Sequence, residues 1–138
     1  MARPGLQARL NNTIFPGFMP HDTLPAAFAS FDVFLFPSES ETFGCVTLEA
    51  MACGVPPVAA DATGSRDIVS HEKNGFLCMP GDADDFAKRV SQLADDLALR
   101  HRFRESALQH AAGCTWDRVL QQMLDHYLRL ASERVAAV

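Results

Sequence analysis

The chain has 138 residues, of which 48% are hydrophobic and 21% are charged, an ordinary composition for one soluble globular domain. Its formal net charge of -5 excludes a general attraction to nucleic acid or to anionic lipid. No apolar run approaches the roughly 18 residues that a membrane helix needs, and the start of the chain lacks the apolar stretch of a secretory signal.

The N-terminal part of the chain is predicted to contain a leader, a strand and a helix. We expect residues 1–11 to form a flexible leader. The segment 13–18 (TIFPGF) is β-branched and aromatic and ends in Pro-Gly, which predicts a short strand. Asp22 is expected to cap a helix that has Pro25 in its first turn. The apolar stripe of this helix would consist of Leu24, Ala27, Phe28 and Phe31.

The middle of the chain alternates between apolar segments and helical segments. The predicted strands cover residues 32–38, 55–61 and 75–80. The first of these is apolar on both faces, as is typical of an interior strand in a parallel sheet. A helix is predicted from about residue 45 to residue 53 and ended by Gly54, and a brief helix is predicted over residues 65–69.

The last third of the chain is predicted to be helical. Asp82 is expected to cap the first helix, Gly113 to end the second and Thr115 to start the third. The apolar positions of these helices recur at helical spacing: Phe86, Val90, Leu93 and Leu97; Leu99, Phe103, Ala107 and Ala111; Trp116, Val119, Leu120, Met123, Tyr127 and Leu130.

Strands that alternate with helices and are followed by further helices indicate an α/β fold. We expect a Rossmann-like, doubly wound parallel sheet with a helical C-terminal tail. In this interpretation residues 12–113 form a partial Rossmann-like domain. Residues 114–134 form a C-terminal helix that packs on a missing domain or on a partner.

Two glutamates frame the helix that follows the first interior strand. In a doubly wound sheet, ligands bind beyond the carboxyl ends of the strands, so the loop over residues 39–44 lies at that edge. Gly44 permits close backbone approach, and the following helix directs free N–H groups and a positive dipole at the loop. Glu41 and Glu49 would each accept hydrogen bonds from hydroxyl groups of a ligand, such as a sugar or ribose diol.

These residues also resemble a known family. The run PSESETFGCVTLEAMACGVPPVAADATGSRDIV is similar to the E-x7-E region of GT4-type retaining glycosyltransferases, which have the two-domain GT-B architecture. The runs HEKNGFLCMPGDADDFAKRVSQLADD and TWDRVLQQMLDHYLRL resemble the segments that follow in that family. The resemblance extends from about residue 12 to residue 132. The nearest subgroup resembles sulfoquinovosyl- and mannosyl-transferases that act on lipid acceptors.

The resemblance implies roles for individual residues. The donor sugar would be held by Glu41 and by the backbone N–H groups of Phe43, Gly44 and Cys45. The N–H group of Val46 would meet the diphosphate, and Glu49 would bind the ribose hydroxyls. The donor would be a UDP- or GDP-hexose, and the acceptor a lipid or a glycan. No cofactor and no metal ion are expected, since no His, Cys, Asp and Glu cluster has ligand spacing.

The chain lacks parts that the family has. The family's donor domain begins with two further βα units, which carry a Gly-rich turn and an Arg/Lys pair, and an acceptor domain is also missing. The chain therefore resembles a C-terminal fragment, which we expect to be inactive alone. In the family's strand order, 3-2-1-4-5-6, it would keep strands 3 to 6. Segment 13–18 would then pair directly with segment 32–38, or the open edge would associate with another copy.

Several interpretations stay open at the level of sequence. The chain could instead be a non-catalytic interaction module that associates through its exposed sheet edge and C-terminal helix. Arg66 could approach the donor pocket, or it could pair with Asp67 or a neighbouring loop. The Asp82-x-Asp84 pattern imitates a metal site, although helix capping explains it better. Because the four cysteines form no C-x-x-C pair, we expect a reducing, cytoplasmic location, with any peripheral membrane contact made through the missing domain.

Overall fold

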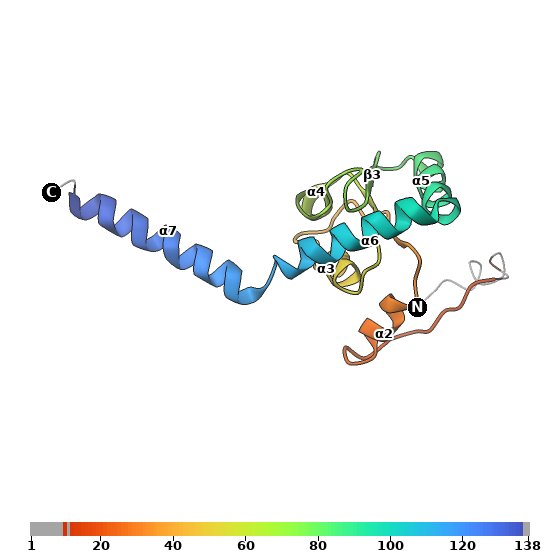
Figure 1. Cartoon of the computed structure of the whole chain (residues 1–138), viewed down its shortest axis with the longest axis horizontal. Helices are drawn as coiled ribbons and strands as arrows, with labels where there is room; N and C mark the ends of the chain where they lie inside the picture. Colours follow the sequence, from red (N-terminus) through yellow and green to blue (C-terminus); the bar gives the residue numbers. More distant parts are fainter. Residues whose placement is uncertain (1–9, 11, 137–138) are drawn as a thin grey trace.

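The computed structural model describes residue 10 and residues 12–136, so the expected leader lies almost entirely outside the described residues. The elements are α2 (Leu24–Ala29), β1 (Phe34–Phe36), α3 (Cys45–Ala52), β2 (Pro57–Ala60), α4 (Thr63–Ile68), β3 (Phe76–Cys78), α5 (Ala83–Asp95), α6 (Leu97–Ala112) and α7 (Trp116–Ala136). Figure 1 shows a body that contains the sheet and its covering helices, from which α7 projects. The predicted α/β class with a helical tail is confirmed.

The sheet is parallel and has the strand order β1-β2-β3. Leu35 of β1 pairs with Val58 of β2, and Ala59 of β2 pairs with Leu77 of β3. This order is the one expected for the last three strands of the Rossmann-like sheet. The central strand β2 is buried throughout, as its uninterrupted apolar sequence requires.

The predicted strand over residues 13–18 is wrong. The structure has no strand in this segment, and the side chains of Ile14 and Phe18 are 90% and 93% exposed. Pro16 offers no N–H group to a neighbouring strand, and β-branched residues form a strand only when a partner is present to pair with them.

The first strand, β1, is an edge strand rather than an interior one. Among the described residues no strand pairs with its outer edge, and Leu35 is 51% exposed. Its apolar sequence is typical of an interior strand, but in the described residues one edge of β1 and the Leu35 side chain are uncovered, as expected for a chain that lacks strands 1 and 2. An edge strand with free backbone N–H and C=O groups is a template for association with another strand.

The helix α2 forms as expected, although its ends differ from the prediction. Its N-cap residue is Thr23, not Asp22, and no side chain caps the helix. The Thr23 hydroxyl donates instead to the carbonyl oxygen of Pro20 at 2.9 Å. Phe31 lies beyond the end of the helix and is exposed.

Two apolar clusters hold the body together. The larger one packs α5 and α6 against β2 and β3 and contains the ring pair Phe76–Phe103, whose centroids are 5.1 Å apart. The smaller one packs α2 against α3 through Phe28, Ala50 and Val55. This second cluster joins α2, which precedes β1, to α3, which follows β1. It therefore also fixes the position of α3, the helix that carries the candidate site.

The caps of α5 and α6 are local and match the sequence pattern. Oδ1 of Asp82 accepts from the N–H groups of Asp84 and Asp85, both at 3.1 Å. Oδ1 of Asp96 accepts from Leu99 N–H at 2.9 Å. The capping interpretation of Asp82-x-Asp84 is therefore confirmed.

The last helix, α7, contacts little of the body. Every side chain described between residues 115 and 134 is exposed, including Trp116 at 80%. Large apolar side chains normally need cover from another surface, so packing of α7 on a missing domain or a partner stays a prediction. In the described part of the chain, no helix is long and apolar enough to cross a membrane.

The cysteines provide a test of this fold. Cys78 in β3 is buried, and burial together with the nearby Asp85 carboxylate raises its pKa to about 11. Cys45 at the start of α3 is exposed. A thiol with a raised pKa stays protonated at pH 8, and the thiolate is the reactive form.

We therefore expect iodoacetamide at pH 8 to modify Cys45 in the native chain and Cys78 only after unfolding in urea. Peptide mass spectrometry over a time course measures both rates. Equal rates at the two residues without denaturant would contradict the burial of β3.

Candidate functional site

The candidate site lies where β1 ends and α3 begins, at the carboxyl edge of the sheet. Gly44 is the N-cap residue of α3 and has a φ of 70°, in the left-handed region that glycine adopts without strain. The first turn of a helix has N–H groups without intrahelical partners and carries a positive dipole. Cys45 and Phe43 are exposed at this end of the helix, and Val46 is half-buried against the α2–α3 cluster.

The Glu41 carboxylate folds back onto the same helix end. The N–H groups of Phe43 and Gly44 donate to Oε1 of Glu41 at 3.3 and 3.1 Å. The backbone oxygen of Glu41 accepts from Gly64 N–H at 2.9 Å and from the Thr63 hydroxyl. Glu41 is therefore held by α4 on one side, while its carboxylate closes the loop before α3.

Two glycines bring the loop and α4 into backbone contact. A Cβ atom on Gly44 would lie 2.8 Å from the carbonyl oxygen of Gly64, and one on Gly64 would lie 2.6 Å from the backbone nitrogen of Gly44. Gly44 is thus in close backbone contact with α4, and the close approach of a ligand expected at Gly44 stays a prediction. Gly64 was not singled out from the sequence. The helix predicted over residues 65–69 begins one residue after Gly64, whereas α4 includes Gly64, and a glycine inside a helix is unfavourable without a packing reason.

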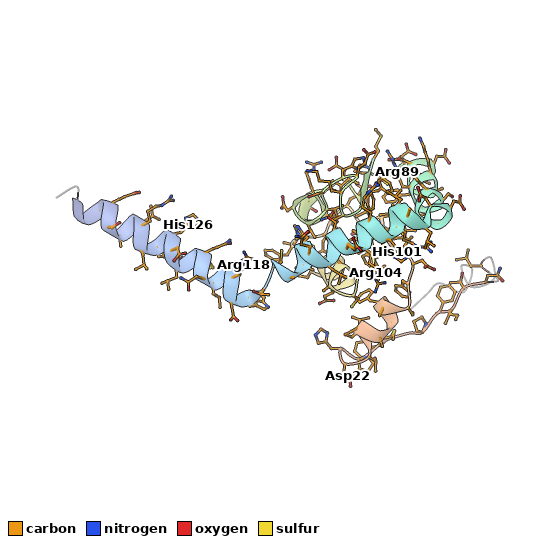
Figure 2. The ribbon with its side chains drawn as sticks, viewed as in Figure 1. Asp22, Arg89, His101, Arg104, Arg118 and His126 are labelled. Atoms are coloured by element: carbon orange, nitrogen blue, oxygen red, sulfur yellow. The ribbon has the colours of Figure 1, made fainter. Side chains whose placement is uncertain are left out.

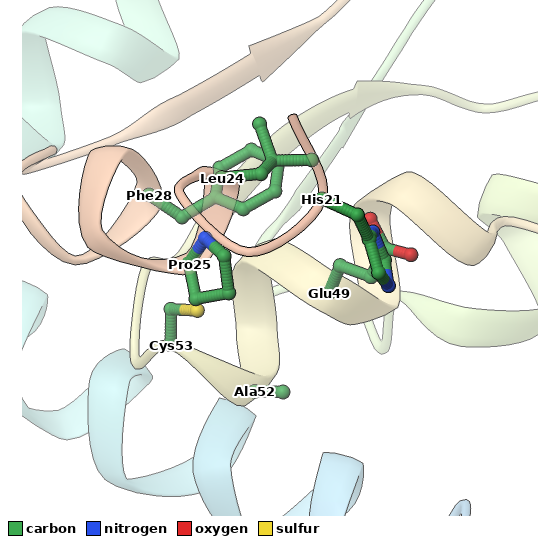
Figure 3. A pocket seen from close by; sticks show the side chains of 7 residues that line it. All are labelled: His21, Leu24, Pro25, Phe28, Glu49, Ala52 and Cys53. Carbon is green, nitrogen blue, oxygen red and sulfur yellow. The ribbon is translucent and has the colours of Figure 1, made fainter. Parts of the chain in front are cut away.

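Glu49 lies on the side of α3 that faces α2 (Figure 3). It is half-buried and lines a pocket of about 340 Å³. The lining residues are His21, Leu24, Pro25, Phe28, Glu49, Ala52 and Cys53. The structure therefore separates the two acids: Glu41 closes the N-terminal end of α3, and Glu49 borders a mostly apolar pocket further along the helix.

His21 also belongs to this pocket. Nothing in the spacing of the five histidines points to this position, because the pocket forms only when α2 packs on α3. Within the described residues, no group of three or more His, Cys, Asp or Glu side chains is placed to hold a metal ion.

Arg66 is engaged next to the site. Its Nε donates to Oδ1 of Asp61 at 2.6 Å, and its Nη2 donates to the backbone oxygen of Asp61 at 2.7 Å. Asp61 follows β2, so this pair joins α4 to a neighbouring loop. Of the open alternatives, the contact with a neighbouring loop is the one observed.

The fold and the site together define a Rossmann-like domain with a glycine-capped helix and two acids beyond its first strand, a class that binds nucleotides at this edge. The family described as "Glycosyl transferases group 1" matches residues 6–110. The chain therefore belongs to this family of glycosyltransferases, which confirms the resemblance in its sequence.

Individual relatives agree with this assignment. The sulfoquinovosyl transferase of Arabidopsis thaliana is 42% identical over 106 residues, which are 75% of this chain and 21% of that protein. The GDP-mannose-dependent alpha-mannosyltransferase of Mycolicibacterium smegmatis is 37% identical over 133 residues, which are 96% of this chain and 35% of that protein.

Among solved structures, the Anabaena protein HepE in complex with UDP matches with a TM-score of 0.79 and 30% identity. The match covers 91% of this chain and 35% of HepE. The chain therefore spans about a third or less of the length of these relatives.

Proposed function

We propose that this chain contributes part of the donor-binding half of a retaining glycosyltransferase that uses a nucleotide sugar. The observation that carries the proposal is the arrangement of Glu41, Gly44 and Glu49 around α3, beyond the carboxyl end of β1, in a chain of this family. Two relatives support a UDP- or GDP-hexose as the donor, since one is a GDP-mannose-dependent alpha-mannosyltransferase and the other was solved in complex with UDP.

The site residues would divide the donor among them. Glu49 would accept hydrogen bonds from the ribose hydroxyls, and Val46 N–H in the first turn of α3 would meet the diphosphate. Glu41 and the N–H groups of Phe43, Gly44 and Cys45 would hold the sugar. Because the Glu41 carboxylate already accepts from two of these N–H groups, a sugar oxygen would have to replace it there.

The chemical contribution of this chain would be electrostatic. When the bond between sugar and diphosphate breaks, negative charge grows on the leaving phosphate oxygen. The dipole of α3 and its free N–H groups stabilise that charge more strongly in the transition state than in the bound donor. No metal ion or cofactor takes part in this proposal. The acceptor would be a lipid or a glycan bound by a part of the protein outside this chain.

The test compares the chain alone with a protein in which the acceptor half and the first βα units are restored. We expect sugar transfer from the restored protein and none from the chain alone, measured by release of UDP or GDP. Transfer should persist in EDTA. Transfer by the isolated chain would contradict the proposal, as would a loss in EDTA that only a divalent ion reverses.

A second candidate is a non-catalytic module that associates with a partner or with another copy. The exposed apolar residues of α7 and the open edge of β1 favour it. A pocket of about 490 Å³ lies between β1 and α5 and is lined by Leu35, Phe86 and others. We propose instead that the rest of the same protein covers these surfaces, and that the protein is cytoplasmic.

Light scattering of the restored protein distinguishes cover by the same chain from association with a partner or another copy. A monomer is expected if the restored chain covers these surfaces itself, and a dimer or larger assembly would favour the interaction module.

A further inference from the structure

Another pocket, which is polar, lies at the amino ends of the strands, opposite the edge that carries Glu41. It has a volume of about 250 Å³. Its walls come from the segments before β1 and β2 and from one face of α6. The lining residues are Phe31, Asp32, Gly54, Pro56, Leu97, Arg100, His101 and Arg104. Figure 2 labels His101 and Arg104 on α6.

Arg100 is held in place by the backbone. Its Nη1 donates to the carbonyl oxygens of Leu93 and Ala94 at 3.1 and 3.3 Å. Its Nη2 lies 3.5 Å from Oδ1 of Asp32, a carboxylate whose side chain is 77% exposed. A guanidinium fixed in this way loses little further freedom when it binds a ligand.

Arg104 lies one turn further along α6, against Gly54. A Cβ atom on Gly54 would be 3.1 Å from Cζ and 3.2 Å from Nε of Arg104, so a side chain there would displace the guanidinium by a few tenths of an ångström. Within the described residues the Arg104 guanidinium forms no hydrogen bond or ion pair. The dipole at the C-terminal end of α3 attracts the Arg104 guanidinium, but this attraction leaves the N–H groups of the guanidinium free to donate to a ligand.

We propose that this pocket binds a phosphate monoester. Two guanidinium groups and an imidazole face a single exposed carboxylate, which gives a local positive field in a chain of net charge -5. Guanidinium groups match the paired oxygens of a phosphate. The exposed Phe31 and Leu97 at the pocket wall suit a small apolar substituent on the ester. This site is separate from the donor site and does not depend on the proposed transferase activity.

The experiment titrates the chain with glycerol phosphate at constant ionic strength and follows binding by calorimetry. The variant Arg104→Gln is compared with the control Arg102→Gln, which removes the same charge from the same helix. The Arg102 guanidinium does not line the pocket, because its Cζ lies over the Phe103 ring, 5.7 Å from the ring centroid. We expect Arg104→Gln to weaken binding by about tenfold or more and Arg102→Gln to leave it nearly unchanged. Equal weakening in both variants would indicate general charge attraction and overturn the proposal.

A second arm identifies the source of the ester. Flotation with phosphatidylcholine vesicles, with and without phosphatidic acid, tests a lipid headgroup. Binding of glycerol phosphate alone assigns a free monoester, and Arg104-dependent binding of phosphatidic acid vesicles assigns a headgroup. If neither probe binds in an Arg104-dependent way while circular dichroism shows all variants folded, the pocket is not a phosphate site.

Discussion

Replacing Gly44 with alanine is expected to destabilise the chain by roughly 2 to 4 kcal/mol, a large share of the stability of a single domain. The left-handed φ of 70° costs about 1 kcal/mol for alanine. The new Cβ atom would also lie 2.7 Å from Cγ1 of Ile68 and 2.8 Å from the carbonyl oxygen of Gly64. The Ile68 side chain can rotate away, but the backbone oxygen can move only if α4 shifts, and such overpacking costs about 1 to 3 kcal/mol.

Substitutions at two other glycines measure the cost of the left-handed φ and the cost of the Cβ overlap separately. Gly81 has a φ of 78°, and no described atom lies within 4 Å of its added Cβ, so Gly81→Ala should cost only about 1 kcal/mol. Gly64 meets backbone atoms of Phe43 and Gly44 without a left-handed φ, so Gly64→Ala reports the overlap alone. Urea unfolding followed by circular dichroism measures all three. Similar losses for Gly44→Ala and Gly81→Ala would show that α4 does not press on this loop.

Replacing Glu49 with alanine should weaken binding of the bare nucleotide and of the nucleotide sugar alike, by about 1.5 to 3 kcal/mol. The reason is that the proposal gives Glu49 the ribose, which both ligands contain. Glu41→Ala should weaken binding of the nucleotide sugar and change the affinity for the bare nucleotide little. Calorimetry on the restored full-length protein measures these four affinities.

The structure adds a control to this comparison. Since Glu41 also closes the loop before α3, its removal could weaken binding by loosening Phe43 and Gly44. Glu41→Gln keeps an acceptor oxygen for these N–H groups and removes the charge. Glu105→Ala, an exposed acid on α6, controls for the change in net charge. Equal losses of bare-nucleotide affinity in the Glu41 and Glu49 variants would contradict the division between sugar and ribose.

Local features of the chain could be predicted from the sequence alone. The start of α3 at Cys45 and its stop before Gly54 follow from a glycine on either side of a helical run, and both glycines have left-handed backbones. The cap at Asp82 follows from side-chain reach over two or three residues. The family, and with it the candidate site, was also readable from the residues around Glu41 and Glu49. These features depend on neighbours within a few positions or on an uninterrupted motif.

Contacts between distant segments were decided by the tertiary structure alone. Segment 13–18 has the composition of a strand, but a strand forms only when another pairs with it, and none does so among the residues that the structure describes. The backbone contact of Gly44 with Gly64 and the pocket that joins Glu49 to His21 each require two elements to pack at one distance and angle. The spacing of residues in one sequence encodes periodicity and caps, but it does not encode that distance or that angle.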